Sequence, residues 1–188
     1  MADAVRVNTE EMAQVAPTLR AGQRVLLSGV CYTSRDAAHK RITQMLDKGE
    51  RPPYDLQGAA IYYAGPTPAP AGLPIGCTSY DNQDNEIGFA VANDPMGPFV
   101  KIADFLDLGL KCMIGKGKRS PEVIEAMKRN GAVYLCAIGG AGALAAQCIE
   151  SAKVIAFEDL GCESVKRLVL KDFPLLVAID SQGNSVVQ

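Results

Sequence analysis

Short apolar runs alternate with amphipathic segments along most of the 188-residue chain. The apolar runs predict strands at 24–30, 58–64, 111–114, 132–138, 154–157, 167–170 and 175–180. The amphipathic segments predict helices at 9–20, 34–48, 98–108, 120–130 and 140–151. Alternation of strands and helices indicates an α/β fold in which at least part of the sheet is parallel.

The helix at 120–130 has the clearest end signals. Ser120 is suited to the N-cap position and Pro121 to the first helical position. Asn130 and Gly131 follow the last apolar position, and such residues commonly end a helix. These signals therefore predict both ends of this helix.

One stretch interrupts the regular pattern. The segment 65–97 contains five prolines, an acidic and amide-rich run at 81–86, and no clear periodicity. Long irregular segments inside a compact domain are usually functional loops. We therefore expect a single domain over 1–188 with an irregular functional loop at about 65–97.

The composition excludes several classes of protein. The formal net charge is −2, aromatic residues make up 6% and tryptophan is absent, so neither charge nor stacking side chains favour nucleic-acid binding. No apolar run has the length of a membrane span, and the N-terminus lacks a basic and then apolar leader. The expectation is a cytoplasmic protein without a membrane segment.

The six cysteines do not form a metal-binding pattern. No two are closer than 12 residues, and several lie inside apolar runs, where cysteine usually behaves as a small buried residue. Without a Cys-x-x-Cys pair, a zinc or iron–sulfur site built by this chain alone has little support. We expect no metal ligands in this chain.

The segment 113–122 concentrates positive charge beside glycines. Gly115 and Gly117 flank Lys116. Two further cations, Lys118 and Arg119, come next, and a predicted helix begins directly after them. Backbone N–H groups and cations gathered in one turn are typical of a site for a carboxylate or phosphate.

A second glycine motif gives an alternative. Gly140-Ala141-Gly142-Ala143-Leu144-Ala145 fits the dinucleotide fingerprint, and Glu158 and Asp159 lie near the place of a ribose-binding acid. Small residues that allow close helix packing explain the same motif. The late position of the motif in the chain favours packing.

Six segments together resemble one family. They are 26–40, 61–68, 113–120, 139–141, 158–161 and 172–174. In this order they resemble the β subunit, or C-terminal domain, of class I fumarases and tartrate dehydratases. The resemblance implies a swivelling β/β/α domain, that is, an α/β fold with a mixed sheet flanked by helices. It also assigns the Gly140 motif to packing.

The resemblance implies a role in hydro-lyase chemistry. Members of this family reversibly hydrate or dehydrate a small hydroxy-dicarboxylate on a [4Fe-4S] cluster, which acts as a Lewis acid. The cluster belongs to the α part, so this chain would need a separate iron–sulfur α subunit as partner. We also expect a homodimer or higher oligomer.

The resemblance also implies the site residues. Arg35 and Lys116 match the family's carboxylate-binding cations, with Gly115 and Gly117 shaping the turn around Lys116. A planar guanidinium and a compact ammonium are both suited to carboxylates. His39, the only histidine, is expected to be structural. Lys118 and Arg119 are expected to support the turn.

One family segment is missing. The family carries Thr-Thr-Ser/Ala-Gly-Arg-Met-Asp in mid-domain, with a proton-transferring threonine and a second carboxylate-binding arginine, but this chain has no arginine between Arg51 and Arg119. One alignment matches Met96 onward to the family's methionine. The other places Thr78 and Ser79 at the threonine pair, which makes Thr78 the candidate base. The departure leaves a non-catalytic paralogue, which binds an organic acid or acts as an assembly module, as the alternative function.

Overall fold

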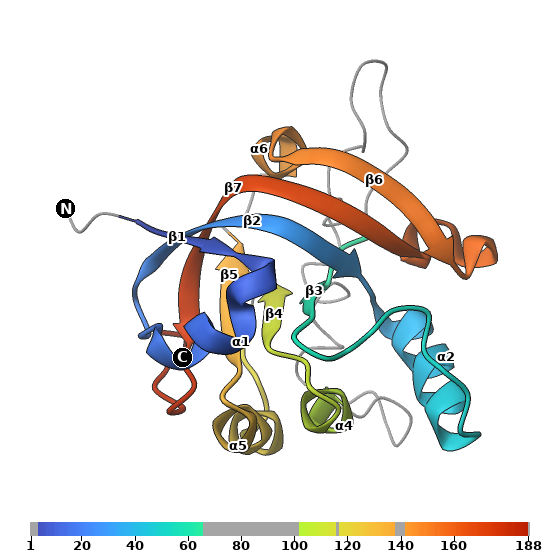
Figure 1. Ribbon diagram of the computed structural model, residues 1–188, viewed down its shortest axis with the longest axis horizontal. Helices are drawn as coiled ribbons and strands as arrows, with labels where there is room; N and C mark the ends of the chain where they lie inside the picture. Colours follow the sequence, from blue (N-terminus) through green and yellow to red (C-terminus); the bar gives the residue numbers. More distant parts are fainter. Residues whose placement is uncertain (1–3, 66–101, 116, 138–141, 188) are drawn as a thin grey trace.

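The computed structural model describes residues 4–65, 102–115, 117–137 and 142–187 (Figure 1). Its strands are β1 (Val5–Asn8), β2 (Arg24–Thr33), β3 (Ala60–Tyr62), β4 (Cys112–Gly115), β5 (Val133–Ala137), β6 (Ile149–Ala156) and β7 (Val165–Ile179). Its α-helices are α1 (Met12–Val15), α2 (Asp36–Asp47), α4 (Ile102–Asp107), α5 (Pro121–Asn130) and α6 (Gly142–Gln147). Three 3₁₀ turns are η1 (Thr9–Glu11), η2 (Ala16–Thr18) and η3 (Glu158–Glu163).

The strands form one mixed sheet that closes on itself. Strands β1 to β5 pair in chain order and are all parallel. Strand β7 is antiparallel to both β5 and β2, so it joins the two sides into a barrel-like sheet, and β6 pairs with its outer side (Figure 1). The predicted α/β class with a mixed sheet and flanking helices is confirmed.

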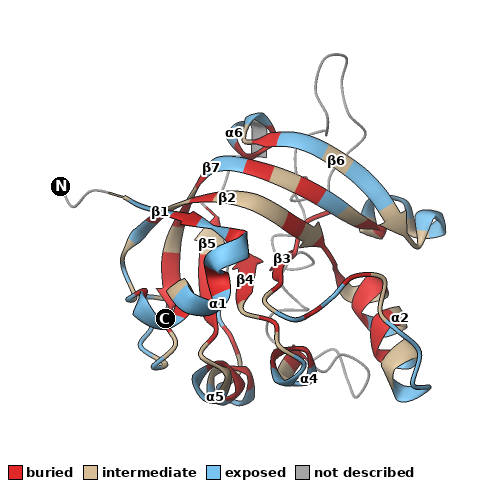
Figure 2. Ribbon diagram, in the orientation of Figure 1, coloured by how far each residue is buried: buried red, intermediate tan, exposed pale blue. Residues whose placement is uncertain are grey.

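Two buried clusters lie on the two sides of this sheet. The interior of the closed sheet holds Val25, Leu27, Ile114, Leu135 and Val177 among others. On the outer side, helices α2, α4 and α5 turn their buried faces toward the sheet and leave their outer faces exposed (Figure 2). Within the described ranges, no helix has the length and apolar character needed to cross a membrane.

The end signals of α5 are confirmed. The Ser120 hydroxyl accepts a hydrogen bond from the Val123 amide at 3.3 Å, and Pro121 is the first helical residue. Gly131 ends the helix in the left-handed region, with φ of 62°. A glycine adopts this conformation at little cost, which explains why the helix stops there.

Two predictions for the C-terminal half of the chain were wrong, and one strand near the N-terminus was not predicted. The runs at 167–170 and 175–180 are one strand, β7, and the predicted helix at 140–151 ends at Gln147 because β6 already begins at Ile149. Strand β1 was missed. It has only four residues, and only one of them, Val7, is buried, so it carries almost no periodic signal.

Close packing around β2 leaves no room for a side chain at Gly29. It lies in β2 with φ of 106°, and a Cβ there would come 2.3 Å from the Thr9 hydroxyl and 2.6 Å from the Asn8 carboxamide oxygen. We expect Gly29→Ala to lower the free energy of unfolding by about 3 kcal/mol, measured in urea. Gly58→Ala is the matched control, because Gly58 also has positive φ (73°) but no atom within 4 Å of the added Cβ. The control should cost about 1 kcal/mol. Equal costs for the two variants would contradict the packing argument.

Candidate functional site

The carboxyl ends of the parallel strands meet at one edge of the sheet. The Ser34 amide donates to the Tyr62 carbonyl at 3.4 Å, and the Tyr63 amide donates to the Ile114 carbonyl at 2.9 Å, so the ends of β2, β3 and β4 stay side by side. Ligands of α/β sheets commonly bind at this edge. The structure therefore brings the segment after β2 and the segment after β4 to the same edge.

Arg35 immediately follows the end of β2 and precedes α2. Its backbone is extended at the N-cap position of the helix, and its side chain makes no capping bond. Only 8% of the residue is exposed, and its Nη2 lies 3.5 Å from Glu163 Oε1. The predicted carboxylate-binding arginine is thus a buried cation at the sheet edge.

Gly65 makes room for Arg35. A Cβ on Gly65 would lie 2.9 Å from Arg35 Nη1 and 3.6 Å from the Cys162 carbonyl oxygen. The guanidinium is therefore packed against bare backbone after β3. Any larger residue at 65 would displace it.

Glu163 connects this arginine to the N-terminus of α2. Its Oε2 accepts a hydrogen bond from the Ala37 amide at 3.3 Å, while its Oε1 faces Arg35. The neighbouring Asp36 carboxyl has a raised pKa, mainly because of burial and despite the lowering effect of Arg35. Sequence reasoning missed Glu163, because it approaches α2 only through the closure of the sheet and no local pattern marks it.

Hydrogen bonds fix the backbone beneath Arg35. The Thr33 hydroxyl donates to the Ser164 carbonyl at 3.2 Å and accepts from the Lys166 amide at 3.0 Å. Lys166 Nζ lies 2.6 Å from the Ser164 hydroxyl oxygen. The end of β2 is thus held firmly to the start of β7.

Two of the other predicted site residues, Gly115 and Gly117, lie within the described residues. Gly115 is the buried last residue of β4, and Gly117 has φ of 83°, which a glycine adopts most easily. Lys116 and Thr78 lie outside the described residues, as does the loop beyond Gly65.

Arg119 is buried beside Gly115. Only 5% of it is exposed, and its Cζ lies 3.6 Å from the centroid of the Tyr134 ring and 5.5 Å from that of Tyr63. Its Nη1 donates to the Lys118 carbonyl at 3.1 Å, and burial lowers its pKa. The bond to Lys118 agrees with a supporting role, but the depth of burial was not predicted.

His39 lies in the core. Its Nδ1 is 3.1 Å from the Ser34 hydroxyl oxygen, and its ring packs edge-on against Phe105 at 4.6 Å and Tyr63 at 5.3 Å between centroids. Burial lowers its pKa to about 3. The ring is neutral at physiological pH, which agrees with the expected structural role.

The surroundings of the Gly140 motif do not fit a dinucleotide site. Strand β6, which follows the motif, pairs with β7 and not with β5, so β5, α6 and β6 do not form the unit of adjacent parallel strands that such a site needs. Asp159 is bound by both terminal nitrogens of Arg41, at 2.7 and 2.5 Å. This favours the packing interpretation of the motif.

The described residues do not fit a metal cluster. No three histidine, cysteine or acidic side chains gather within the described ranges in a way that could hold a metal ion. Cys31 and Cys112 are in the core, where burial raises the pKa of both thiols and so disfavours the thiolate that a metal requires.

Comparison with known proteins identifies the class of domain. The family model described as the fumarase C-terminus matches residues 1–188, and the chain belongs to this family. It is 34% identical over 169 residues to "Fumarate hydratase 2" of Leishmania major and 31% identical over 169 residues to "Fumarate hydratase class I, anaerobic" of Escherichia coli. Each alignment covers 88% of this chain but only 27% and 28% of those two enzymes.

A third relative has nearly the same extent as this chain. "Putative L(+)-tartrate dehydratase subunit beta" of Methanocaldococcus jannaschii is 35% identical over 173 residues, which cover 90% of this chain and 84% of that protein. The resemblance inferred from the sequence motifs is confirmed. The names of these relatives, fumarate hydratase and tartrate dehydratase, are names of hydro-lyases.

Proposed function

We propose that this chain is the β subunit of a cytoplasmic hydro-lyase that reversibly hydrates or dehydrates a small hydroxy-dicarboxylate together with a separate α subunit. The observation that carries the proposal is the buried Arg35 at the carboxyl edge of the sheet, in a chain that belongs to the fumarase C-terminus family. The relative named as a subunit beta supports a separate partner.

In this proposal the chain binds and orients the substrate. Arg35 binds one carboxylate through its planar guanidinium, held in place by Glu163 and by the space at Gly65. The turn at Gly115 and Gly117 presents Lys116 as a binding and catalytic cation, and Thr78 is the candidate base. These last two roles rest on the resemblance of the sequence segments.

We assign the [4Fe-4S] cluster of the proposed enzyme to the α subunit. The described residues of this chain offer no ligand set for it. The proposal also includes the swivelling β/β/α domain as the fold family of this chain, and assembly as a homodimer or higher oligomer of the paired subunits.

An anaerobic pulldown of the tagged chain from its own cells tests the proposal. We expect an equimolar partner, several iron atoms per complex, and dehydration of at least one member of a panel of hydroxy-dicarboxylates. Recovery of the chain alone, without iron or activity, would overturn the proposal. It would favour the non-catalytic paralogue, which the lack of any arginine between Arg51 and Arg119 also favours.

A further inference from the structure

Arg119 is a buried cation for which the described residues provide no carboxylate. Arg35 and Arg119 are the buried arginines of the described ranges. Arg35 faces Glu163, whereas Arg119 makes no salt bridge with a described residue, and its Nε and Nη2 have no hydrogen-bond partner there. Buried polar nitrogens without a partner are rare and costly in folded proteins.

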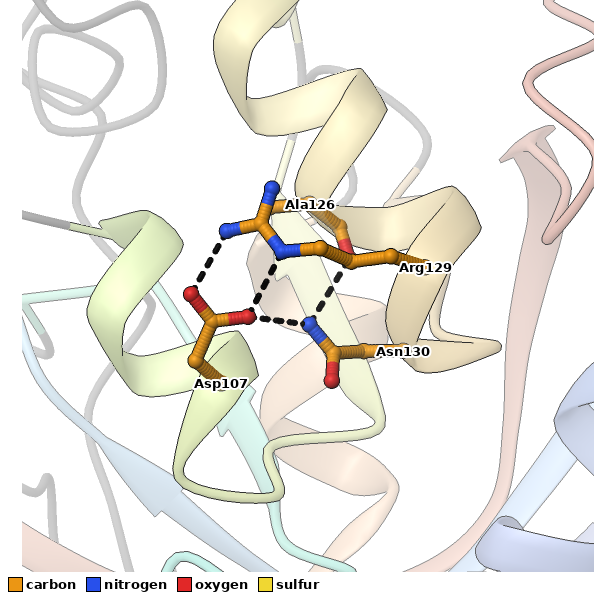
Figure 3. Close-up of polar contacts among 4 residues, drawn as sticks. All are labelled: Asp107, Ala126, Arg129 and Asn130. Atoms are coloured by element: carbon orange, nitrogen blue, oxygen red, sulfur yellow. Dashed lines mark hydrogen bonds and ion pairs between the residues drawn. The ribbon is translucent and has the colours of Figure 1, made fainter.

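The two unpartnered nitrogens are those that a carboxylate binds side-on. Nε–H and Nη2–H point in the same direction on one edge of the guanidinium, so they match the two oxygens of a carboxylate. Arg129 shows this arrangement within the same molecule, because its Nε and Nη2 donate to Asp107 Oδ1 and Oδ2 at 2.8 and 2.6 Å (Figure 3). Arg119 presents the same pair of donors without the carboxylate.

The position of Arg119 increases the need for an anion. It directly precedes Ser120, the N-cap of α5, and the N-terminus of a helix carries partial positive charge. Stacking on Tyr134 compensates part of the lost hydration, but no described residue supplies a carboxylate for the rest of the charge. A cation and a helix N-terminus thus reinforce each other at the sheet edge.

Gly115 and Tyr134 lie close to the guanidinium of Arg119. A Cβ on Gly115 would lie 3.2 Å from Arg119 Nη2 and 3.3 Å from the Tyr134 hydroxyl oxygen, so the missing side chain leaves both groups next to the end of β4. The Tyr134 hydroxyl also has no partner among the described residues. It can donate a further hydrogen bond to a carboxylate oxygen.

We propose that Arg119 binds a carboxylate group of a small organic acid side-on, through Nε and Nη2, as Arg129 binds Asp107. The inference rests on the proposed function, because it assigns a second carboxylate-binding residue to the same sheet edge. It changes Arg119 from a supporting residue of the turn to a binding residue. With Arg35 at the end of β2, the edge then offers two guanidinium groups to a dicarboxylate.

The test compares the full chain with its Arg119→Lys and Arg119→Met variants. Succinate binding is measured by titration calorimetry, and thermal unfolding is followed with and without succinate. We expect Arg119→Lys, which keeps the charge but loses the paired donors, to weaken binding at least tenfold. Arg129→Lys is the matched control, since Arg129 is exposed and already bound to Asp107. The succinate affinity of this variant should stay within about twofold of the wild type.

Thermal unfolding without acid separates a binding role from a structural one. Arg119→Met should unfold at the same or a higher temperature than the wild type, because it removes an uncompensated buried charge. Succinate should no longer raise this temperature. A lower unfolding temperature with unchanged succinate affinity would show that Arg119 only supports the turn, and a wild-type chain that binds no succinate would equally overturn the assignment.

The same variants keep this inference distinct from the proposed function. A chain whose succinate affinity depends on Arg119, but whose complex dehydrates no hydroxy acid, would overturn the proposed function alone. An active complex whose KM is unchanged by Arg119→Lys would overturn the Arg119 assignment alone.

Discussion

Replacing Arg35 by alanine is expected to lower kcat/KM of the proposed hydro-lyase complex by about 10²–10³-fold. Truncating one partner of a buried charge pair costs several kcal/mol, and each 1.4 kcal/mol corresponds to a factor of ten in rate. Arg35→Lys should lose about tenfold to a hundredfold, because the ammonium keeps the charge but not the planar pair of donors. The measurement is steady-state kinetics of the complex on its best hydroxy-dicarboxylate.

Arg41→Lys is the control for Arg35. Arg41 lies on the same helix, α2, and is bound to Asp159 at the surface, where ion pairs contribute little. Its replacement should leave kcat/KM within about twofold of the wild type. Equal losses for the Arg35 and Arg41 variants would contradict the assigned role of Arg35.

Gly65→Ala tests the position of Arg35 without removing it. The added Cβ would lie 2.9 Å from Nη1, at the flexible end of the arginine side chain, so the guanidinium can shift while the backbone stays in place. We expect KM to rise about tenfold or more while the free energy of unfolding changes by less than about 1 kcal/mol. A normal KM would show that the exact place of the guanidinium at Gly65 does not matter for binding.

Local sequence signals predicted the elements whose ends they encode. α5 is the clearest case, because its N-cap, first-turn proline and terminal glycine are all local features. The two halves of β7 could not be joined from the sequence, since a charged pair, Lys171 and Asp172, and then Pro174 interrupt its apolar pattern. Asp172 has φ of 47°, and the β2–β7 register shifts close by, between Leu27 and Gly29. Strand β2 pairs with residues of β7 on both sides of this interruption.

The candidate site was likewise predictable only where local sequence signals mark its residues. Arg35 and the glycine turn follow strands, and chain order alone brings the ends of parallel strands together. Glu163 reaches Arg35 through the antiparallel closure by β7, which no spacing along the chain reveals. The burial of Arg119 also has no sequence signal, because arginines are mostly exposed and its local pattern resembles any charged turn.

His39 should make the free energy of unfolding fall steeply in acid. Burial lowers its pKa from 6.5 to about 3, so between these values the unfolded chain binds a proton that the folded chain does not. Stability is therefore complete above pH 6.5 and is lost as the pH falls toward 3, by about 1.4 kcal/mol per pH unit. The neutral ring between Phe105 and Tyr63 is the physical cause.

The slope of the unfolding free energy against pH isolates the contribution of His39, because His39 is the only histidine in the chain. In urea unfolding between pH 4 and 6, His39→Phe should lower the slope of the unfolding free energy against pH by about 1.4 kcal/mol per pH unit, the contribution of one proton, whatever the absolute stability of the variant. His39→Asn is a second variant, which preserves a polar partner for Ser34. Asp36 has a raised pKa and so acts in the opposite direction, favouring the folded state in acid, but it is present in all three proteins and cancels in the difference. Parallel slopes for the wild type and both variants would mean that the folded chain protonates this ring as readily as the unfolded chain, and the core around Tyr63 would then have to admit a charge.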